Sequence, residues 1–287
     1  MNIGLAHQGA VFSLKCAEMM RRVDPAEAVP SYENAIGMYC EIGRFFTAGN
    51  LAVAVAELFE EDKNIEEALG YYKQAADYYK GEGYDHQASI NLLKVAKLAA
   101  LTNRFDFATE TFEKVSIHYI NDNLKRLNVK DLFLRAGLCQ LANGGPIFQG
   151  LASHKVLQYY ILKWKGIDYE FATSRECLFL ENMLLVIPKA DLHVFADHVY
   201  NMDNVVGFDS WCLRLLKRVK EDIEERVFEV EGERKIKAAR DKLVADVEAG
   251  IISKDRLEEF DDANGTWDLG KEAAAPPPAA PVEGIPE

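Results

Sequence analysis

The sequence predicts an all-α protein, a right-handed α-solenoid of helical hairpins followed by a C-terminal helical bundle. Three observations support this fold class: a pattern repeated every forty residues, helical spacing within that pattern, and the composition of a globular chain. The chain has 287 residues, of which 49% are hydrophobic and 28% are charged. This supplies enough apolar material for a large core and excludes a fibrous or wholly disordered protein.

The repeat consists of small and aromatic residues that alternate along one helix face. Its members are Ala28, Tyr32, Ala35 and Tyr39, then Ala68, Tyr72, Ala75 and Tyr79, then Ala108, Phe112, Val115 and Tyr119. Steps of four, three and four residues place each set on one side of an α-helix. An ordinary helical bundle explains this spacing but not the common register. The pattern therefore predicts tetratricopeptide-like hairpins, in which small residues allow close helix approach and aromatic residues fill the grooves.

The remaining elements follow in chain order. A second helix completes the first two units at residues 48–59 and 88–101, with turns at Gly43, Gly81/Gly83 and Asn103. Further helices are predicted at residues 129–142, 154–164, 174–187, 190–200 and 210–225. We expect residues 1–228 to form the solenoid and its bundle, 229–270 a charged, acidic, helix-capable extension, and 271–287 a disordered tail rich in Ala and Pro.

The negative charge is concentrated near the C-terminus. The formal net charge is −13, and residues from Glu221 onward contain 19 acidic and 9 basic residues. The first 220 residues are therefore almost neutral. This distribution argues against a protein that binds nucleic acid.

Neither a compartment signal nor a catalytic motif is visible. The five cysteines have no CxxC spacing, which indicates a reducing compartment, and we expect a cytoplasmic protein because no signal peptide or membrane span is present. His193 and His198 lie five residues apart, so they do not share a helix face and are interpreted as surface histidines. Cys139 and Cys177 lie in apolar helical segments and are interpreted as buried thiols. We expect no enzyme, no metal and no cofactor.

Several segments resemble the soluble NSF attachment proteins of the α/β type. They are Ala75–Glu82, Leu92–Ala96, Glu41–Phe45, Lys130–Phe133, Ala136–Cys139, Ser174–Cys177, Asp209–Trp211 and Leu215–Lys220. They occur in the order found in the family, and the resemblance covers about residues 10–225. It implies a peripheral membrane adaptor in vesicle fusion and intracellular transport. Such an adaptor binds the four-helix SNARE bundle (syntaxin-type) and recruits the AAA+ ATPase NSF, which takes the bundle apart.

The resemblance also implies which residues face the SNARE bundle. The family's basic positions match Arg21, Arg22, Arg44, Lys94, Lys130 and Arg175, and Leu124 matches an apolar contact position. Each of these charges could alternatively be an ordinary solvated side chain. As a set on one face, they would attract an acidic, rod-shaped partner and make its binding sensitive to salt.

The resemblance also implies departures from the family. We expect the chain to lack the family's first pair of repeat units, including a hydrophobic loop, and to carry an insertion around Gly144-Gly145-Pro146. Leu185, Pro188 and Lys189 stand where the family has acidic residues that dock the ATPase, so the docking residues are unknown. The chain also continues well past the family's end. Two alternatives follow: a tetratricopeptide-like scaffold with changed partners, or an incomplete gene model of the adaptor.

Overall fold

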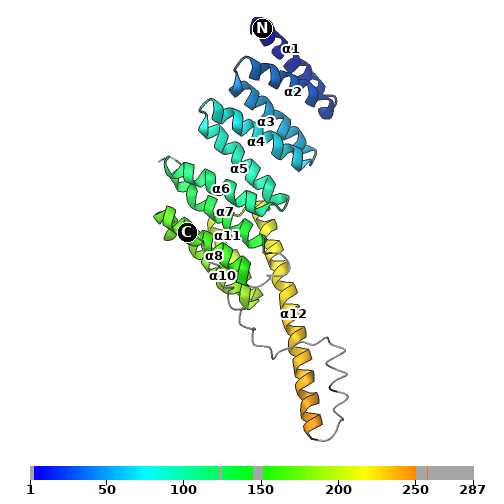
Figure 1. Ribbon diagram of the computed structural model, residues 1–287, viewed down its shortest axis with the longest axis vertical. Coiled ribbons are helices and arrows are strands. Elements are labelled where there is room, and N and C mark those ends of the chain that lie inside the picture. Colours follow the sequence, from blue (N-terminus) through cyan, green and yellow to red (C-terminus); the bar gives the residue numbers. More distant parts are fainter. Residues whose placement is uncertain (1–2, 123–124, 145–150, 250–256, 258–287) are drawn as a thin grey trace, which may run out of the picture. The chain divides into compact units, whose positions relative to one another are not determined.

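The computed structural model describes residues 3–122, 125–144, 151–249 and 257 (Figure 1). The chain divides into two compact units, Met1–Val227 and Phe228–Glu287, and each is considered by itself. All regular secondary structure in the described ranges is helical, which confirms the predicted all-α class.

The first unit begins with a regular stack of helices that pack in sequence order (Figure 1). They are α1 (Ile3–Arg21), α2 (Pro25–Glu41), α3 (Phe45–Glu61), α4 (Ile65–Gly81), α5 (Asp85–Leu101), α6 (Phe105–Ile120) and α7 (Val129–Ala142), with a short 3-10 helix η1 (Arg126–Asn128) before α7. Every small and aromatic member of the predicted repeat is buried. The repeat therefore forms the core of a solenoid, as the sequence predicts.

The connections within the stack share one backbone conformation. Gly43, Lys63, Gly83 and Asn103 have φ values of 74°, 61°, 80° and 61°, which place them in the left-handed region. In each turn, the N–H of the next residue donates to a carbonyl five residues earlier, as from Arg44 to Tyr39 at 2.8 Å. This geometry satisfies the last carbonyls of the preceding helix. The turns recur every twenty residues, half the period that the side chains revealed.

The bundle that follows is less regular. It contains α8 (Leu151–Ile167), α9 (Tyr169–Ala172), α10 (Arg175–Val186), a 3-10 helix η2 (Ile187–Lys189), α11 (Leu192–Val206) and the first part of α12 (Ser210–Glu248). The predicted helix 190–200 begins later because Ala190 adopts a left-handed φ of 53° and the Asp191 side chain caps α11. The predicted helix 210–225 was too short, since α12 contains no proline and continues to Glu248.

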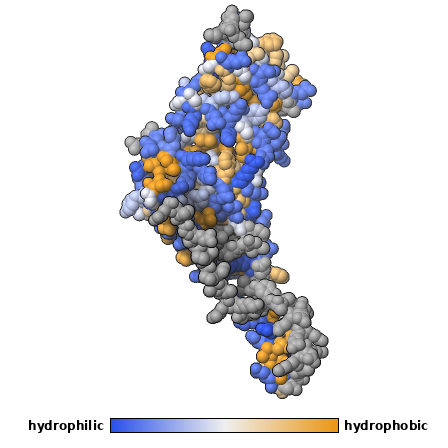
Figure 2. Space-filling view, viewed as in Figure 1, coloured by the Kyte–Doolittle hydropathy of each residue, from blue (hydrophilic) through white to orange (hydrophobic). Residues whose placement is uncertain are grey.

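An aromatic cluster forms the centre of the bundle. The Trp164 ring lies 5.2 Å from that of Phe133 and 6.2 Å from that of Phe171, measured between centroids. All three side chains are fully buried. On the face shown in Figure 2, the surface of the first unit is largely hydrophilic, interrupted by separate hydrophobic patches.

The second unit is described only in part. Within it, α12 runs to Glu248, and Leu257 is the last described residue. The remainder of the predicted acidic extension and the whole predicted tail 271–287 lie outside the described residues. The division of the chain into these segments stays a prediction.

Candidate binding surface

The basic residues singled out in the stack lie on alternate helices. Arg21 ends α1, Arg44 immediately precedes α3, Lys94 lies in the middle of α5, and Lys130 is in the first turn of α7. None of them lies on α2, α4 or α6. Because alternate helices of a solenoid form one layer, these four side chains belong to the same layer of the stack.

Within that layer the charges are spread out. Alternate helices run in the same direction, so the C-terminal residue Arg21 of α1 and Arg44 at the start of α3 lie at opposite ends. A helix of 17 residues such as α3 is about 25 Å long. Arg22 follows α1 and Arg175 begins α10 in the bundle, whereas Leu124 lies outside the described residues. The arrangement is an extended surface, suited to a long partner.

Lys94 is held by contacts inside the protein. Its ammonium nitrogen lies 3.4 Å from a Glu57 carboxylate oxygen and 3.2 Å from the Tyr72 hydroxyl oxygen. It also lies 4.5 Å from the centroid of the Tyr72 ring, a cation–π distance. Tyr72 donates in turn to Glu60 at 2.9 Å. Lys94 therefore helps to join α5 to α3 and α4 in addition to presenting a charge.

The other basic residues are more available. Among the described residues, Arg21 forms a long ion pair with Glu61, at 3.9 Å, and no other. Among the residues that the structure describes, Arg22, Arg44 and Lys130 form no ion pair. These three charges can therefore reach a partner without breaking an ion pair among the described residues.

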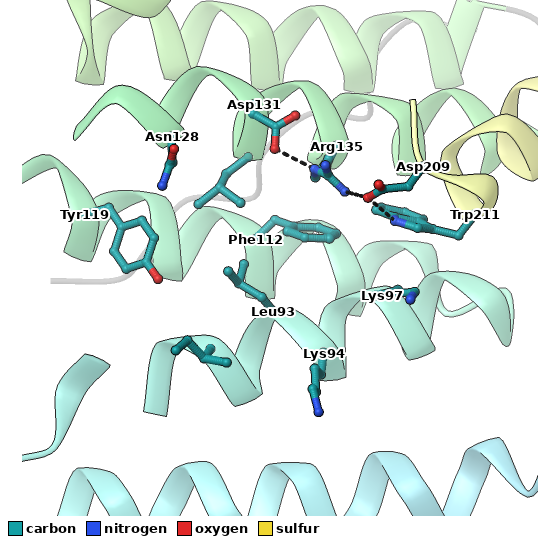
Figure 3. A pocket seen from close by; sticks show the side chains of 12 residues that line it. Leu93, Lys94, Lys97, Phe112, Tyr119, Asn128, Asp131, Arg135, Asp209 and Trp211 are labelled. Carbon is teal, nitrogen blue, oxygen red and sulfur yellow. Dashed lines mark hydrogen bonds and ion pairs between the residues drawn. The ribbon is translucent and has the colours of Figure 1, made fainter. Parts of the chain in front are cut away.

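A pocket of about 370 Å³ opens beside Lys94, between α5, α6, α7 and the start of α12 (Figure 3). Leu93, Phe112 and Trp211 form its apolar wall, and the rings of Phe112 and Trp211 stack with centroids 5.8 Å apart. Lys94 and Lys97 lie at its edge. The pocket presents apolar surface next to positive charge, which suits an apolar side chain followed by a carboxylate.

Arg135 connects two aspartates that line this pocket. The Arg135 guanidinium donates to Asp131 and to Asp209, each at 2.6 Å, and Trp211 donates to Asp209 at 3.2 Å (Figure 3). Both carboxylates keep the pKa of Arg135 above its usual value, although burial opposes this. The hydrogen bond from Arg135 lowers the pKa of Asp209. This network fixes the start of α12 against α7.

Sequence reasoning assigned no role to Arg135 or Lys97. Two segments quoted for the family resemblance, Lys130–Phe133 and Asp209–Trp211, supply the partners of Arg135 in the structure. The spacing of Asp131 and Arg135, four residues apart on a helix, was the one sequence pattern that could have indicated the pair. Nothing in the sequence connected either residue to Asp209.

Apolar and basic residues stand at the positions where the family has acidic docking residues. The Leu185 side chain on α10 is 63% exposed, and Pro188 and Lys189 are exposed in η2. The structure therefore presents apolar and basic side chains there.

The two cysteines considered for chemistry lie in the core. Cys139 and Cys177 are buried, and burial raises the pKa of the Cys177 thiol to about 11. Asp191, near the two histidines, accepts a hydrogen bond from the Val194 backbone as the cap of α11. In the described part of the chain, no group of His, Cys, Asp and Glu side chains has the arrangement of a metal site. No helix in that part is both long and apolar enough to cross a bilayer.

Comparison with known proteins identifies the family. A model of the soluble NSF attachment proteins matches residues 2–224. The chain is 33% identical over 206 residues to a probable vesicular-fusion protein sec17 homolog of Schizosaccharomyces pombe, which covers 71% of this chain and 68% of the relative. It is 30% identical to the β-soluble NSF attachment protein of Bos taurus over 78% of this chain and 72% of the relative. For the α-soluble NSF attachment protein of Homo sapiens, identity is 29% over 76% and 71% of the two chains. The chain belongs to the soluble NSF attachment protein family.

Proposed function

We propose that this protein is a cytoplasmic adaptor that binds the SNARE four-helix bundle along α1, α3, α5 and α7 and recruits the AAA+ ATPase NSF to take the bundle apart. Membership of the attachment protein family supports such an adaptor, without enzymatic activity of its own, at the level of the family. Its association with membranes would be peripheral and would depend on membrane-anchored SNAREs of the syntaxin type.

The observation that carries this proposal is the common layer of Arg21, Arg44, Lys94 and Lys130. The spread of these charges over several parallel helices suits a rod-shaped acidic partner better than a compact one. Exposed charges at the edge of an interface mainly accelerate encounter and add less to affinity. The association rate should therefore fall steeply as salt is raised.

Charge reversal at Arg44 and Lys130 tests the surface most cleanly. Neither residue has an ion pair among the described residues, so Arg44→Glu with Lys130→Glu reverses charge without breaking such a pair. We expect the dissociation constant for a purified, assembled SNARE bundle to rise by about tenfold at low salt. The matched control is Lys73→Glu with Lys80→Glu, two exposed residues on α4 in the other layer. Lys94 is less suitable because its reversal would also set a carboxylate against Glu57.

The result that contradicts the proposal is equal binding by both double variants and the parent. ATPase recruitment needs a second measurement, namely disassembly of the SNARE bundle by NSF and ATP with and without this protein. Bundle binding without any stimulation of disassembly would support the first half of the proposal and reject the second.

A scaffold with changed partners is the second candidate. The observation that favours it is the exposed Leu185 with Lys189, where acidic docking residues were expected. In that case the C-terminal extension would be the new docking element. Deleting residues 229–287 separates the two candidates, since unchanged disassembly activity would make the extension dispensable and argue against the scaffold.

A further inference from the structure

Three leucines on α8 and α10 expose most of their side chains. Leu162 is 62% exposed, Leu178 is 56% exposed and Leu185 is 63% exposed. A single exposed leucine is ordinary on a protein surface, but several on neighbouring helices mark an interaction site. Whether they form one surface depends on how α8 and α10 meet.

An ion pair between the two helices places the leucines together. Lys165 of α8 donates to Glu181 of α10 at 2.5 Å. Leu162 lies one turn before Lys165, and Leu178 and Leu185 lie one turn before and one turn after Glu181. Each of the three leucines therefore lies within about one helical turn of the Lys165–Glu181 pair. We refer to Leu162, Leu178 and Leu185 as the leucine face.

Positive charge lies at both ends of the leucine face on α10. Arg175 is one turn before Leu178, and Lys189 follows Leu185 by four residues in η2. Both side chains are exposed, and neither forms an ion pair with any other described residue. Lys165 and Glu181 neutralise each other. The two charges at the ends of the leucine face that lack an ion-pair partner among the described residues, Arg175 and Lys189, are both positive. Glu176 lies about 100° around the helix from Arg175 and so faces another direction.

We propose that the leucine face docks an acidic amphipathic helix of a partner protein. Apolar side chains of that helix would cover the three leucines, and its carboxylates would meet Arg175 and Lys189. Leu178 and Leu185 are separated by two helical turns, the spacing at which a docked helix presents its own apolar residues. A nucleic acid would satisfy the cations but would leave the leucines in water. Of the residues that the family resemblance assigns to bundle binding, only Arg175 adjoins the leucine face, whereas the proposed function places the bundle along α1, α3, α5 and α7.

The test uses two synthetic helical peptides of about five turns that share one leucine-lined face. The acidic probe carries glutamate at its remaining surface positions, and the basic probe carries lysine there. Binding of each fluorescein-labelled probe to the full chain is followed by fluorescence anisotropy. We expect the acidic probe to bind and the basic probe to bind at least about tenfold more weakly.

Variants then locate the binding site. Leu178→Ser with Leu185→Ser should raise the dissociation constant of the acidic probe by about tenfold, since both apolar anchors are lost. Lys189→Glu should raise the dissociation constant of the acidic probe by about threefold and reduce the salt dependence of its binding. The matched control is Leu127→Ser with Leu213→Ser, two leucines that are 74% and 42% exposed on η1 and α12. The control should bind as the parent does, and all variants should retain the parent's helical circular dichroism.

Several outcomes would overturn the proposal. They are failure of the acidic probe to bind, equal binding of both probes, and equal loss in the leucine-face and control variants. Sedimentation with vesicles containing anionic phospholipid tests whether the leucine face binds a membrane instead of a helix. If the leucine-face variant loses vesicle binding but keeps probe binding, the surface contacts a membrane and the proposal is wrong. SNARE-bundle binding should be unchanged in that variant, which separates this test from the test of the proposed function.

Discussion

The stack α2–α6 and the bundle α8–α11 differ in how one helix is connected to the next and how each helix begins. Helices α3 to α6 have no side-chain cap at their first residue, and each follows a three-residue turn with one residue at positive φ. In the bundle, Asp168, Ser174 and Asp191 cap the starts of α9, α10 and α11 with side-chain oxygens. A repeated backbone turn gives parallel, evenly spaced helices, whereas individual caps allow each helix its own direction.

Packing differs in the same way. The stack buries small residues against aromatic residues at equivalent positions of every unit, so each helix packs mainly against its neighbours. The bundle buries one shared aromatic cluster around Trp164, which contacts residues from two other helices. Damage should therefore remain local in the stack and spread in the bundle.

The largest expected effect comes from Trp164→Ala. Removing this fully buried ring from its contacts with Phe133 and Phe171 should lower the free energy of unfolding by about 3–5 kcal/mol. Hydrogen exchange should accelerate in α7, α8 and α10, while α1–α4 keep the protection of the parent. Chemical denaturation and exchange followed by mass spectrometry measure both effects.

Trp164→Phe is the matched control for this prediction. The indole Nε1 is buried without a hydrogen-bond partner in the described structure, so phenylalanine keeps an aromatic ring and removes an unsatisfied donor. Trp164→Phe should lower the free energy of unfolding much less than Trp164→Ala does. Uniform acceleration of exchange from α1 to α10 in Trp164→Ala would show that the two regions are not separate in their response.

Glycines at helix contacts give the next largest difference between the regions. A Cβ atom at Gly137 on α7 would lie 2.5 Å and 2.6 Å from the Leu180 methyl carbons. Leu180 is fully buried, so moving its methyl groups aside disturbs the surrounding core, and Gly137→Ala should cost about 1–3 kcal/mol of stability.

Gly49 on α3 is the corresponding position in the stack. There a Cβ atom would lie 3.1 Å from the Tyr79 ring, which requires a shift of only a few tenths of an ångström. The gain in helix propensity from alanine, about 0.5–1 kcal/mol, offsets much of this cost. Urea denaturation of both variants should show the larger loss for Gly137→Ala, and the reverse order would contradict the comparison.

The link between Asp209 and Arg135 should make stability depend on pH. The hydrogen bond from Arg135 lowers the pKa of Asp209, so the folded state binds that proton less readily than the unfolded state. The resulting stabilisation is present above the unfolded pKa of about 3.9 and is lost as pH falls through the folded pKa.

Asp209→Asn measures the size of this contribution. Because the Asp209 side chain is 53% exposed, we expect a loss of only about 0.5–1 kcal/mol at neutral pH. Denaturation of parent and variant between neutral pH and about pH 3 should show the two curves converging at the acidic end. The control is Asp77→Asn at an exposed position on α4. Its free energy of unfolding should equal that of the parent at every pH. A pH-independent difference would mean that the carboxylate charge is not involved.

The sequence predicted the stack better than the bundle, for physical reasons. Repetition reveals which positions are buried because the same small and aromatic residues recur, and every one of them is indeed in the core. The bundle has no such repetition, and its Phe133–Trp164–Phe171 cluster joins residues far apart in the chain. Residue spacing on one helix carries no information about contacts of that kind.

The candidate surface was predictable only in part. Family resemblance selected Arg44 and Lys130, but it could not indicate that Lys94 is held by Glu57 and Tyr72. That contact joins three helices, and it depends on how α3, α4 and α5 pack. The Arg135 network was missed for the same reason, since Asp209 lies 74 residues further along the chain.

The smallest expected effect tests the repeated turns. Lys63 occupies the position that glycine holds at Gly43 and Gly83, with a φ of 61° that costs a side chain about 1 kcal/mol or more. Lys63→Gly should therefore raise the free energy of unfolding by about 0.5 kcal/mol, after the greater flexibility of glycine in the unfolded chain is counted. Gly43→Ala should do the opposite by a similar amount. At Asn103 the gain from glycine should be smaller or absent, because its side-chain oxygen accepts a hydrogen bond from Arg218 at 2.6 Å. Thermal and urea denaturation of the three variants give the ranking, and a loss of stability in Lys63→Gly would show that its side chain contributes more than the backbone strain costs.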